Sequence, residues 1–308
     1  MKNKMKTITK INADGKEISS MDAADFLDSA IRKKESEKGT YSYGYKINNY
    51  VYRNYISNDA WTAFLQDLED HYPSIYSSFQ KGKGGEITQK GSTPPKMACS
   101  GSSSFFAIEQ LKNIHNIEFE KELKKRVCKG INPQIDAFVK TEKTNIFVEV
   151  KCHEIYDKIH KGSKSYKKVY DSIGQGLKFD ENTEIFSLKG ATITSFDIKQ
   201  IICHFLGICA EVLEDRMTTP TVRFIYIIYN PNAVKKYMTE RQWSEVEGQY
   251  NKCKKEIDLF GDMKWLFDAI YKFQRENLTK KRLIKYSGEC AFEFCVADQD
   301  DCLGYFTE

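Results

Sequence analysis

Two acids and a lysine flank a short polar loop in this chain, and their types suit the hydrolysis of a phosphate ester. Asp136 precedes the loop at Thr141–Thr144, and Glu149 and Lys151 follow it. The apolar residues on both sides favour a β-hairpin built around that loop. Its register places Asp136 directly opposite Glu149 and puts Lys151 on the same face of the hairpin.

The same register determines what each face of the hairpin carries, because side chains alternate along a strand and Lys140 then pairs with Asn145. One face is apolar at every position and is expected to be buried: Ile135, Ala137, Val139, Ile146, Val148, Val150 and Cys152. The other face is mixed: Gln134, Asp136, Phe138, Lys140, Asn145, Phe147, Glu149 and Lys151. A strand pair with one buried face therefore presents both acids and the lysine together on the other.

Like charges directly across a hairpin destabilise it, so two facing carboxylates need a compensating function. A shared divalent cation or a shared proton would supply one. Two hard oxygen ligands suit Mg²⁺ or Mn²⁺, with Mg²⁺ retaining several waters and taking further oxygens from a phosphate substrate. Lys151, two residues after Glu149, would hold or activate a water near that cation. The set predicts metal-dependent hydrolysis of a phosphodiester.

Asp136 followed by Glu149-Val150-Lys151 resembles the Asp…Glu-x-Lys core of the PD-(D/E)XK nuclease superfamily, which includes restriction enzymes and Holliday-junction resolvases. The chain departs from that pattern in lacking a Pro-Asp dipeptide, with Pro133 three residues before the acid. The expected order of elements between about residues 100 and 230 is also similar to the superfamily's: helix, strands, motif hairpin, helix, strand.

The resemblance implies roles for individual residues. Asp136, Glu149 and the backbone carbonyl of Val150 would ligate the metal, and Lys151 would orient the attacking water and stabilise developing charge. Glu109, on a helix that follows a Gly-Ser-rich approach, is similar to an extra acid of several subfamilies; an exposed helix acid is the alternative.

Two amides remain, and only Gln134 is assigned to the expected site. Gln134 faces Lys151 across the hairpin and would orient it. Gln200, on a later helix, is similar to a residue of uncharacterised bacterial nucleases of this type, but the preferred interpretation is a polar residue on the helix face.

Basic residues flank the motif on both sides in sequence. The cluster Lys158, Lys161, Lys164, Lys167 and Lys168 follows it, and five more cations precede it between residues 121 and 129. Phosphate contacts are expected of the following cluster, with solvated faces as the alternative. The net charge of +4 is compatible with a polyanionic partner without demanding one.

Composition limits the class of protein. In 308 residues, 41% are hydrophobic and 13% aromatic, which favours a folded chain with a sizeable core. No apolar run reaches the length of a membrane span, and the basic start lacks a following apolar stretch. We therefore expect a cytoplasmic protein with no membrane partner, whose nine cysteines are reduced.

Helix and strand signals predict an α/β protein with two parts. Residues 1–90 form an expected accessory region, with a helix over 22–34, a Tyr-rich extended arm over 40–55 and a helix capped at Ser57. Residues 91–308 form the expected nuclease domain. In chain order we expect this domain to contain a helix over 103–113, a strand over 118–127, the hairpin, a helix capped by Ser195, a strand over 222–229, two helices over 240–259 and 263–276, and late strands over 283–286 and 290–297.

The expected fold is a restriction-endonuclease-like core: a central mixed β-sheet flanked by helices, with the N-terminal region added. The expected function is a Mg²⁺-dependent DNA endonuclease of restriction or restriction-like defence or repair type. It would act on double-stranded DNA. The sequence leaves the oligomeric state open, and a homodimer is one of the arrangements it allows. A catalytically silent nucleic-acid-binding protein on the same fold is the alternative. A third hypothesis is a globular protein in which the three motif residues form a surface salt-bridge cluster.

Overall fold

The computed structural model describes residues 22–82, 85–128, 130, 132–157, 159–214, 221–286 and 288–306. The chain divides into two compact units. Unit 1 comprises residues 1–112, 152–157 and 230–250, and unit 2 comprises 113–151, 158–229 and 251–308. The boundary expected near residue 90 therefore falls inside unit 1, which also takes in two later segments of the chain.

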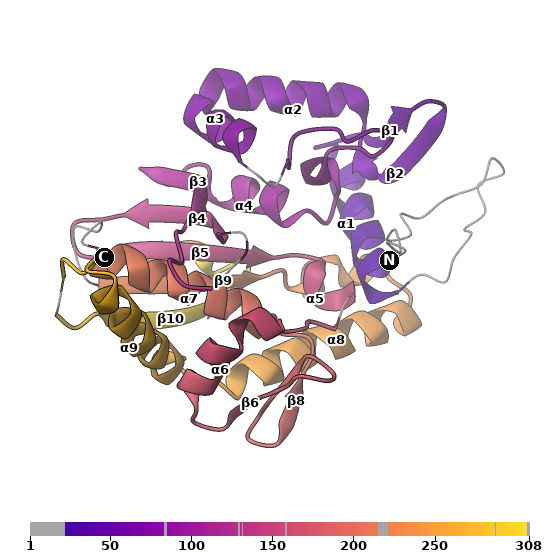
Figure 1. Ribbon diagram of the computed structural model, residues 1–308. Helices are drawn as coiled ribbons and strands as arrows, with labels where there is room; N and C mark the ends of the chain where they lie inside the picture. Colours follow the sequence, from indigo (N-terminus) through magenta and orange to yellow (C-terminus); the bar gives the residue numbers. More distant parts are fainter. Residues whose placement is uncertain are drawn as a thin grey trace. The chain divides into compact units, whose positions relative to one another are not determined.

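Unit 2 is built on a five-stranded mixed sheet in the order β10-β9-β5-β4-β3 (Figure 1). Its strands are β3 (Ile117–Glu122), β4 (Gln134–Lys140), β5 (Asn145–Lys151), β9 (Thr221–Ile228) and β10 (Ala291–Ala297). The first three are antiparallel neighbours, and β5, β9 and β10 run parallel. This is the expected α/β architecture with helices beside a mixed sheet. Strand β5 lies where the antiparallel half meets the parallel half.

Helices α7 (Ile198–Leu213) and α9 (Lys264–Lys280) lie side by side on one face of this sheet. The Phe205 ring of α7 meets Phe224 of β9 edge-on at 5.4 Å, and Phe267 of α9 stacks on Phe292 of β10 at 4.1 Å. Phe224 pairs with Phe147 in register, and alternation puts Phe147 on the face that carries Glu149 and Lys151. The helices therefore cover the face on which the sequence places the polar residues.

Gly207 allows α7 to approach the segment after β3 closely. A Cβ at this position would lie 2.5 Å from Cβ of Leu123, closer than side-chain atoms normally approach. Most of α7 is buried, which accounts for its long apolar stripe.

The remaining elements of unit 2 surround this layer. They are α6 (Lys167–Ile173), the end of α8 (Glu240–Asp258), and an antiparallel three-stranded sheet of β6 (Leu177–Asp180), β7 (Ile185–Leu188) and β8 (Ala191–Ile193). Two short 3₁₀ helices, η2 (Lys164–Tyr166) and η4 (Cys302–Phe306), complete it.

Unit 1 contains mainly helices and one hairpin. The helices are α1 (Ala23–Lys38), α2 (Asn58–His71), α3 (Pro73–Lys81), α4 (Ser103–Leu111) and α5 (Glu154–Asp157), with η1 (Lys96–Ala98), η3 (Pro231–Tyr237) and the start of α8. The hairpin joins β1 (Tyr43–Ile47) to β2 (Tyr50–Ile56) and accounts for the Tyr-rich arm. Ser57 caps α2 as expected, its hydroxyl accepting from the Ala60 N–H.

Three expectations for unit 2 are wrong. The cap of α7 is Asp197, whose Oδ1 accepts from the Gln200 N–H, and the helix begins at Ile198. Ser195 is instead buried, with its N–H bound to Glu256. Residues 283–286 form no strand, and the N–H groups of Lys285 and Tyr286 donate to the Leu213 carbonyl. The strand expected over 118–127 ends at Glu122.

Among the described residues, no helix is both long enough and apolar enough to span a membrane.

Candidate functional site

The register of the β4–β5 hairpin is the predicted one. Lys140 pairs with Asn145, and the ladder continues through Ala137 opposite Val148. Asp136 and Glu149 are the next residues along the two strands, just beyond the last pair of this ladder. Oδ2 of Asp136 accepts a 2.7 Å hydrogen bond from the Val150 N–H. The carboxylate thus takes a backbone donor from the opposing strand.

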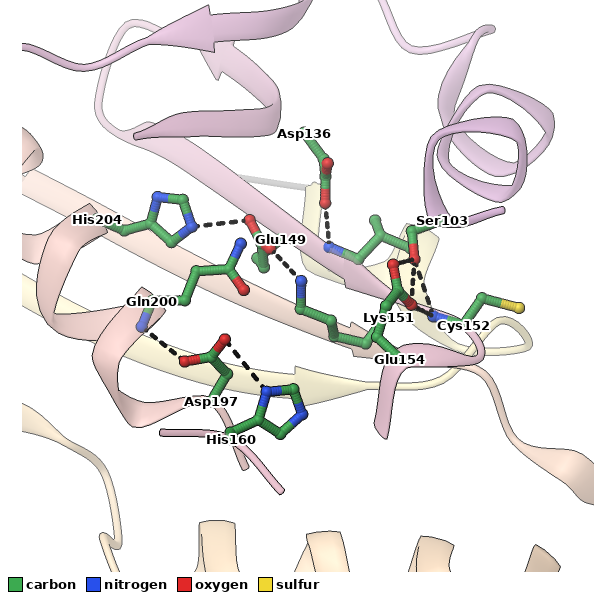
Figure 2. Close-up of polar contacts among 11 residues, drawn as sticks. Ser103, Asp136, Glu149, Lys151, Cys152, Glu154, His160, Asp197, Gln200 and His204 are labelled. Carbon is green, nitrogen blue, oxygen red and sulfur yellow. Dashed lines mark hydrogen bonds and ion pairs between the residues drawn. The ribbon is translucent and has the colours of Figure 1, made fainter. Parts of the chain in front are cut away.

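Glu149 lies at the centre of a buried polar cluster (Figure 2). The residue is 1% exposed. Nζ of Lys151 donates to Oε1 of Glu149 at 2.6 Å, and Nε2 of His204 lies 3.0 Å from Oε2. Lys151 and His204 are themselves 7% and 1% exposed. The hypothesis of a surface salt-bridge cluster is therefore wrong, because α7 covers this face of the sheet.

The two carboxyl groups differ in their electrostatics. Burial is the largest influence on the pKa of Glu149 and raises it, but the Lys151 charge and the contacts with Lys151 and His204 outweigh burial, and the pKa is lowered overall. The pKa of Asp136 is raised well above its usual range, first by burial and then by the neighbouring Glu149 charge. Burial and the neighbouring charges therefore shift the pKa values of the two carboxyl groups in opposite directions.

Helix α7 supplies two polar residues to the same place. Gln200 and His204 are four residues apart, so both lie on one side of the helix. Figure 2 shows the Gln200 amide directed toward the Glu149–Lys151 pair, beside His204. The sequence indicated Gln200 only as the less favoured interpretation and gave no indication of His204. The Gln-x-x-x-His spacing was the available signal, hidden within an otherwise apolar stripe.

Asp197 and His160 form a second pair beside α7. Oδ2 of Asp197 lies 3.3 Å from Nδ1 of His160, while Oδ1 caps the helix. The His160 contact and the helix cap contribute to a lowered pKa of Asp197, although burial, the largest influence, acts in the opposite direction. This negative charge stands at the start of the helix that carries Gln200 and His204.

A cavity of about 590 Å³ adjoins the cluster within unit 2. Its wall includes Gln134, Asp197, Lys199, Gln200 and His204. Nδ1 of His204 is buried without a hydrogen-bond partner among the described residues. His204 therefore both lines the cavity and contacts Glu149, the carboxylate of the buried ion pair with Lys151.

The other predicted site residues are Gln134, Glu109 and the lysines that follow the motif. Gln134 begins β4, pairs with Glu122 of β3 and lines the cavity. Glu109 belongs to unit 1, where its carboxylate lies 3.0 Å from Nζ of Lys112. Lys161, Lys164, Lys167 and Lys168 are exposed side chains of unit 2, and Lys158 lies outside the described residues.

Figure 2 also draws a polar group that belongs to unit 1. The Glu154 carboxylate accepts from the Ser103 hydroxyl at 2.5 Å and from the Cys152 N–H at 3.0 Å. These bonds hold the beginning of α5.

The residues predicted to bind a cation are Asp136, Glu149 and the Val150 carbonyl. Across the described ranges, no three His, Cys, Asp or Glu side chains come together as a metal cluster. Two carboxylates nevertheless suit Mg²⁺, which keeps several waters and needs few protein ligands. The raised pKa of Asp136 also favours a cation at this position, because positive charge would offset the repulsion between Asp136 and Glu149.

Glu256 of α8 holds the loop that leads into α7. Its buried carboxylate accepts hydrogen bonds from the backbone N–H groups of Thr194, Ser195 and Phe196, at 2.7 to 3.1 Å. These bonds fix the entry of the chain into the helix that carries Gln200 and His204.

Replacing Glu256 with alanine is expected to lower the free energy of unfolding by about 2–4 kcal/mol, because three backbone donors, two of them buried, lose their acceptor. Urea unfolding measures the loss. Asp258→Ala, which removes an exposed acid on the same helix, is the control and should change stability by less than about 0.5 kcal/mol. Equal stabilities of the two variants would contradict the role of Glu256.

No protein-family model matches this sequence, no curated protein matches it, and no solved structure matches the fold.

Proposed function

We propose that this protein is a Mg²⁺- or Mn²⁺-dependent nuclease, with DNA as its substrate and unit 2 as a restriction-endonuclease-like domain. The observation that carries the proposal is the buried Glu149–Lys151 pair on β5, with Asp136 beside it on β4. The order of the supporting elements agrees with the resemblance seen in the sequence. Three antiparallel strands are followed, after α5, η2, α6 and the β6–β8 sheet, by α7 and the parallel strand β9.

Asp136, Glu149 and the Val150 carbonyl would hold the metal. When bound, the ion would supply a Lewis acid for the phosphate and an activated water. Lys151 is held by Glu149, so its ammonium is fixed in position and can stabilise charge that develops on the phosphate. His204 contacts the other oxygen of Glu149 and fixes that carboxylate from the side of α7.

The test is cleavage of nucleic acid by the purified full chain. Supercoiled plasmid, linear duplex, single-stranded DNA and RNA are incubated with Mg²⁺, with Mn²⁺ or with EDTA, and the products are separated on gels. We expect DNA cleavage with either metal and none in EDTA. Cutting that persists in EDTA would overturn the metal assignment, and intact substrate under all conditions would overturn the nuclease proposal.

A silent nucleic-acid-binding protein remains the second candidate, favoured by the exposed lysines that follow the motif. The four described lysines are not equivalent. Nζ of Lys167 is paired with Asp171 at 3.1 Å and with Glu181 at 3.2 Å, and these hydrogen bonds raise its pKa. Lys164 and Lys168 are therefore the better candidates for phosphate contacts.

Replacing Lys164 and Lys168 together with alanine is expected to weaken duplex binding. It should also flatten the plot of log affinity against log salt by about 0.9 for each phosphate that is no longer neutralised, because fewer counterions are then released on binding. Fluorescence anisotropy in EDTA measures both quantities without cleavage. Lys167→Ala is the matched control and should have the smaller effect. An unchanged salt slope in the double variant would remove this segment from the interface.

A further inference from the structure

A second cavity lies wholly within unit 1, where α1, the β1–β2 hairpin and η3 meet. Its volume is about 500 Å³, within the usual range of small-ligand sites. Arg32 and Lys33 of α1, Arg53 of β2 and the rings of Tyr43 and Tyr237 line it. None of these residues takes part in the site proposed on unit 2.

The charge of this cavity favours an anion. Three cationic side chains line it against one carboxylate, that of Glu37. The Glu37 carboxylate already accepts from the Tyr237 hydroxyl at 2.6 Å and lies 3.4 Å from Nζ of Lys236, a cation outside the lining. Cationic side chains therefore outnumber carboxylates in the lining of this cavity.

Two of the cations are anchored by the backbone. Nη1 of Arg32 donates to the Arg53 carbonyl at 3.2 Å, and Nζ of Lys33 donates to the Tyr237 carbonyl at 3.4 Å. These contacts join α1 to the hairpin and to η3. They reduce the side-chain entropy that an anion would otherwise cost on binding.

The hairpin leaves the cavity accessible to a flat ligand. Gly44 lines it at a break in the β1–β2 register, with φ of +123°, so no side chain fills that part of the wall. Val51 also lines the cavity and is 45% exposed, and Tyr43 adds an aromatic ring. Apolar and aromatic surface beside guanidinium groups suits a base attached to a phosphate.

We propose that this cavity binds a phosphorylated nucleoside unit, either a free nucleotide or one residue of a single strand. The guanidinium groups of Arg32 and Arg53 and the ammonium of Lys33 would hold the phosphate, and Tyr43 and Val51 would contact the base. The proposal depends on unit 1 alone, so it stands or falls separately from the nuclease assignment.

The first experiment uses a short fluorescein-labelled oligothymidine and the full chain, with EDTA present. Val51→Asp places a carboxylate at an exposed position in the cavity, and Val51→Asn has nearly the same shape without the charge. We expect Val51→Asp to weaken binding by roughly tenfold relative to Val51→Asn, an effect of the size seen when a hydrogen bond to a charged group is removed. Equal binding by the two variants would overturn the proposal.

Removing the cations provides a second measurement. Arg53→Ala and Lys33→Ala should each weaken binding roughly tenfold and lower the salt slope by about 0.7, the value for one phosphate of a single strand. Lys81→Ala, which removes an exposed cation of α3 outside the cavity, should leave both unchanged. Thermal unfolding confirms that each variant is folded. Equal reductions in affinity in all three variants would indicate attraction by net charge alone and overturn the site.

Competition distinguishes the two sources of the phosphate. Displacement of the probe by adenosine monophosphate or inorganic phosphate supports a site for a free nucleotide. Displacement only by unlabelled oligonucleotide supports a site for a strand. Competition that is identical in the wild type and in Arg53→Ala would show that the competitor binds elsewhere and would contradict the proposal.

Discussion

Replacing Glu149 with glutamine is expected to reduce DNA cleavage about a thousandfold or more, because several kcal/mol of transition-state stabilisation depend on a charged metal ligand. Glutamine keeps the shape of the side chain, so packing under α7 is preserved. Single-turnover cleavage of a labelled duplex measures the effect. Glu142→Gln, in the exposed hairpin loop, is the control and should retain activity. Near-normal cleavage by Glu149→Gln would remove this residue from the site.

Stability must be followed in the same variant, because Glu149→Gln leaves the Lys151 ammonium buried without its carboxylate. Removing one partner of a buried pair typically costs about 3–5 kcal/mol of unfolding free energy. The double variant Glu149→Gln/Lys151→Met removes both charges and should regain part of that stability while remaining inactive. Restored cleavage in the double variant would mean that the single variant had failed only through unfolding.

Lys151→Met is expected to lower turnover about 10²–10³-fold, the usual effect of losing one donor that stabilises transition-state charge. Both carboxylates remain, so Mn²⁺ binding measured by calorimetry should persist. Lys151→Arg should also be poor, because a planar fork does not replace a compact ammonium in a buried position.

Lys140→Met removes an exposed lysine from the same hairpin and serves as the control. Full cleavage by Lys151→Met would show that the Glu-x-Lys match is accidental. Loss of Mn²⁺ binding together with turnover would show that the lysine serves only to keep the ligands in place.

Local signals in the sequence predicted much of unit 2. The loop at Thr141–Thr144 and the alternation around it determined the β4–β5 register, and the continuous apolar run at β9 predicted a central strand. Both depend on residues close in sequence, so pattern and structure agree. The helices over 240–258 and 264–280 were likewise predicted close to their observed bounds.

The burial of the motif could not be predicted in the same way. Glu149 and Lys151 alternate with apolar residues, a pattern typical of a strand with one solvated face. Their face is covered because α7, far along the chain, packs across it. His204 was missed for the same reason, since only the docked helix brings it to Glu149. At the start of α7 the sequence predicted Ser195 as the cap. In the structure Asp197 is the cap, and the buried Ser195 N–H donates to Glu256.

The cover that α7 places over the motif also determines when in folding the site can form. Strand β5 is complete long before the ribosome reaches His204, and until α7 docks, Glu149 and Lys151 face water. The contacts that bury them join distant parts of the chain, and such contacts form late because long loops must close first. A nascent or partly folded chain would therefore lack the ordered carboxylate and lysine, and any activity of this site would begin only with completed tertiary structure.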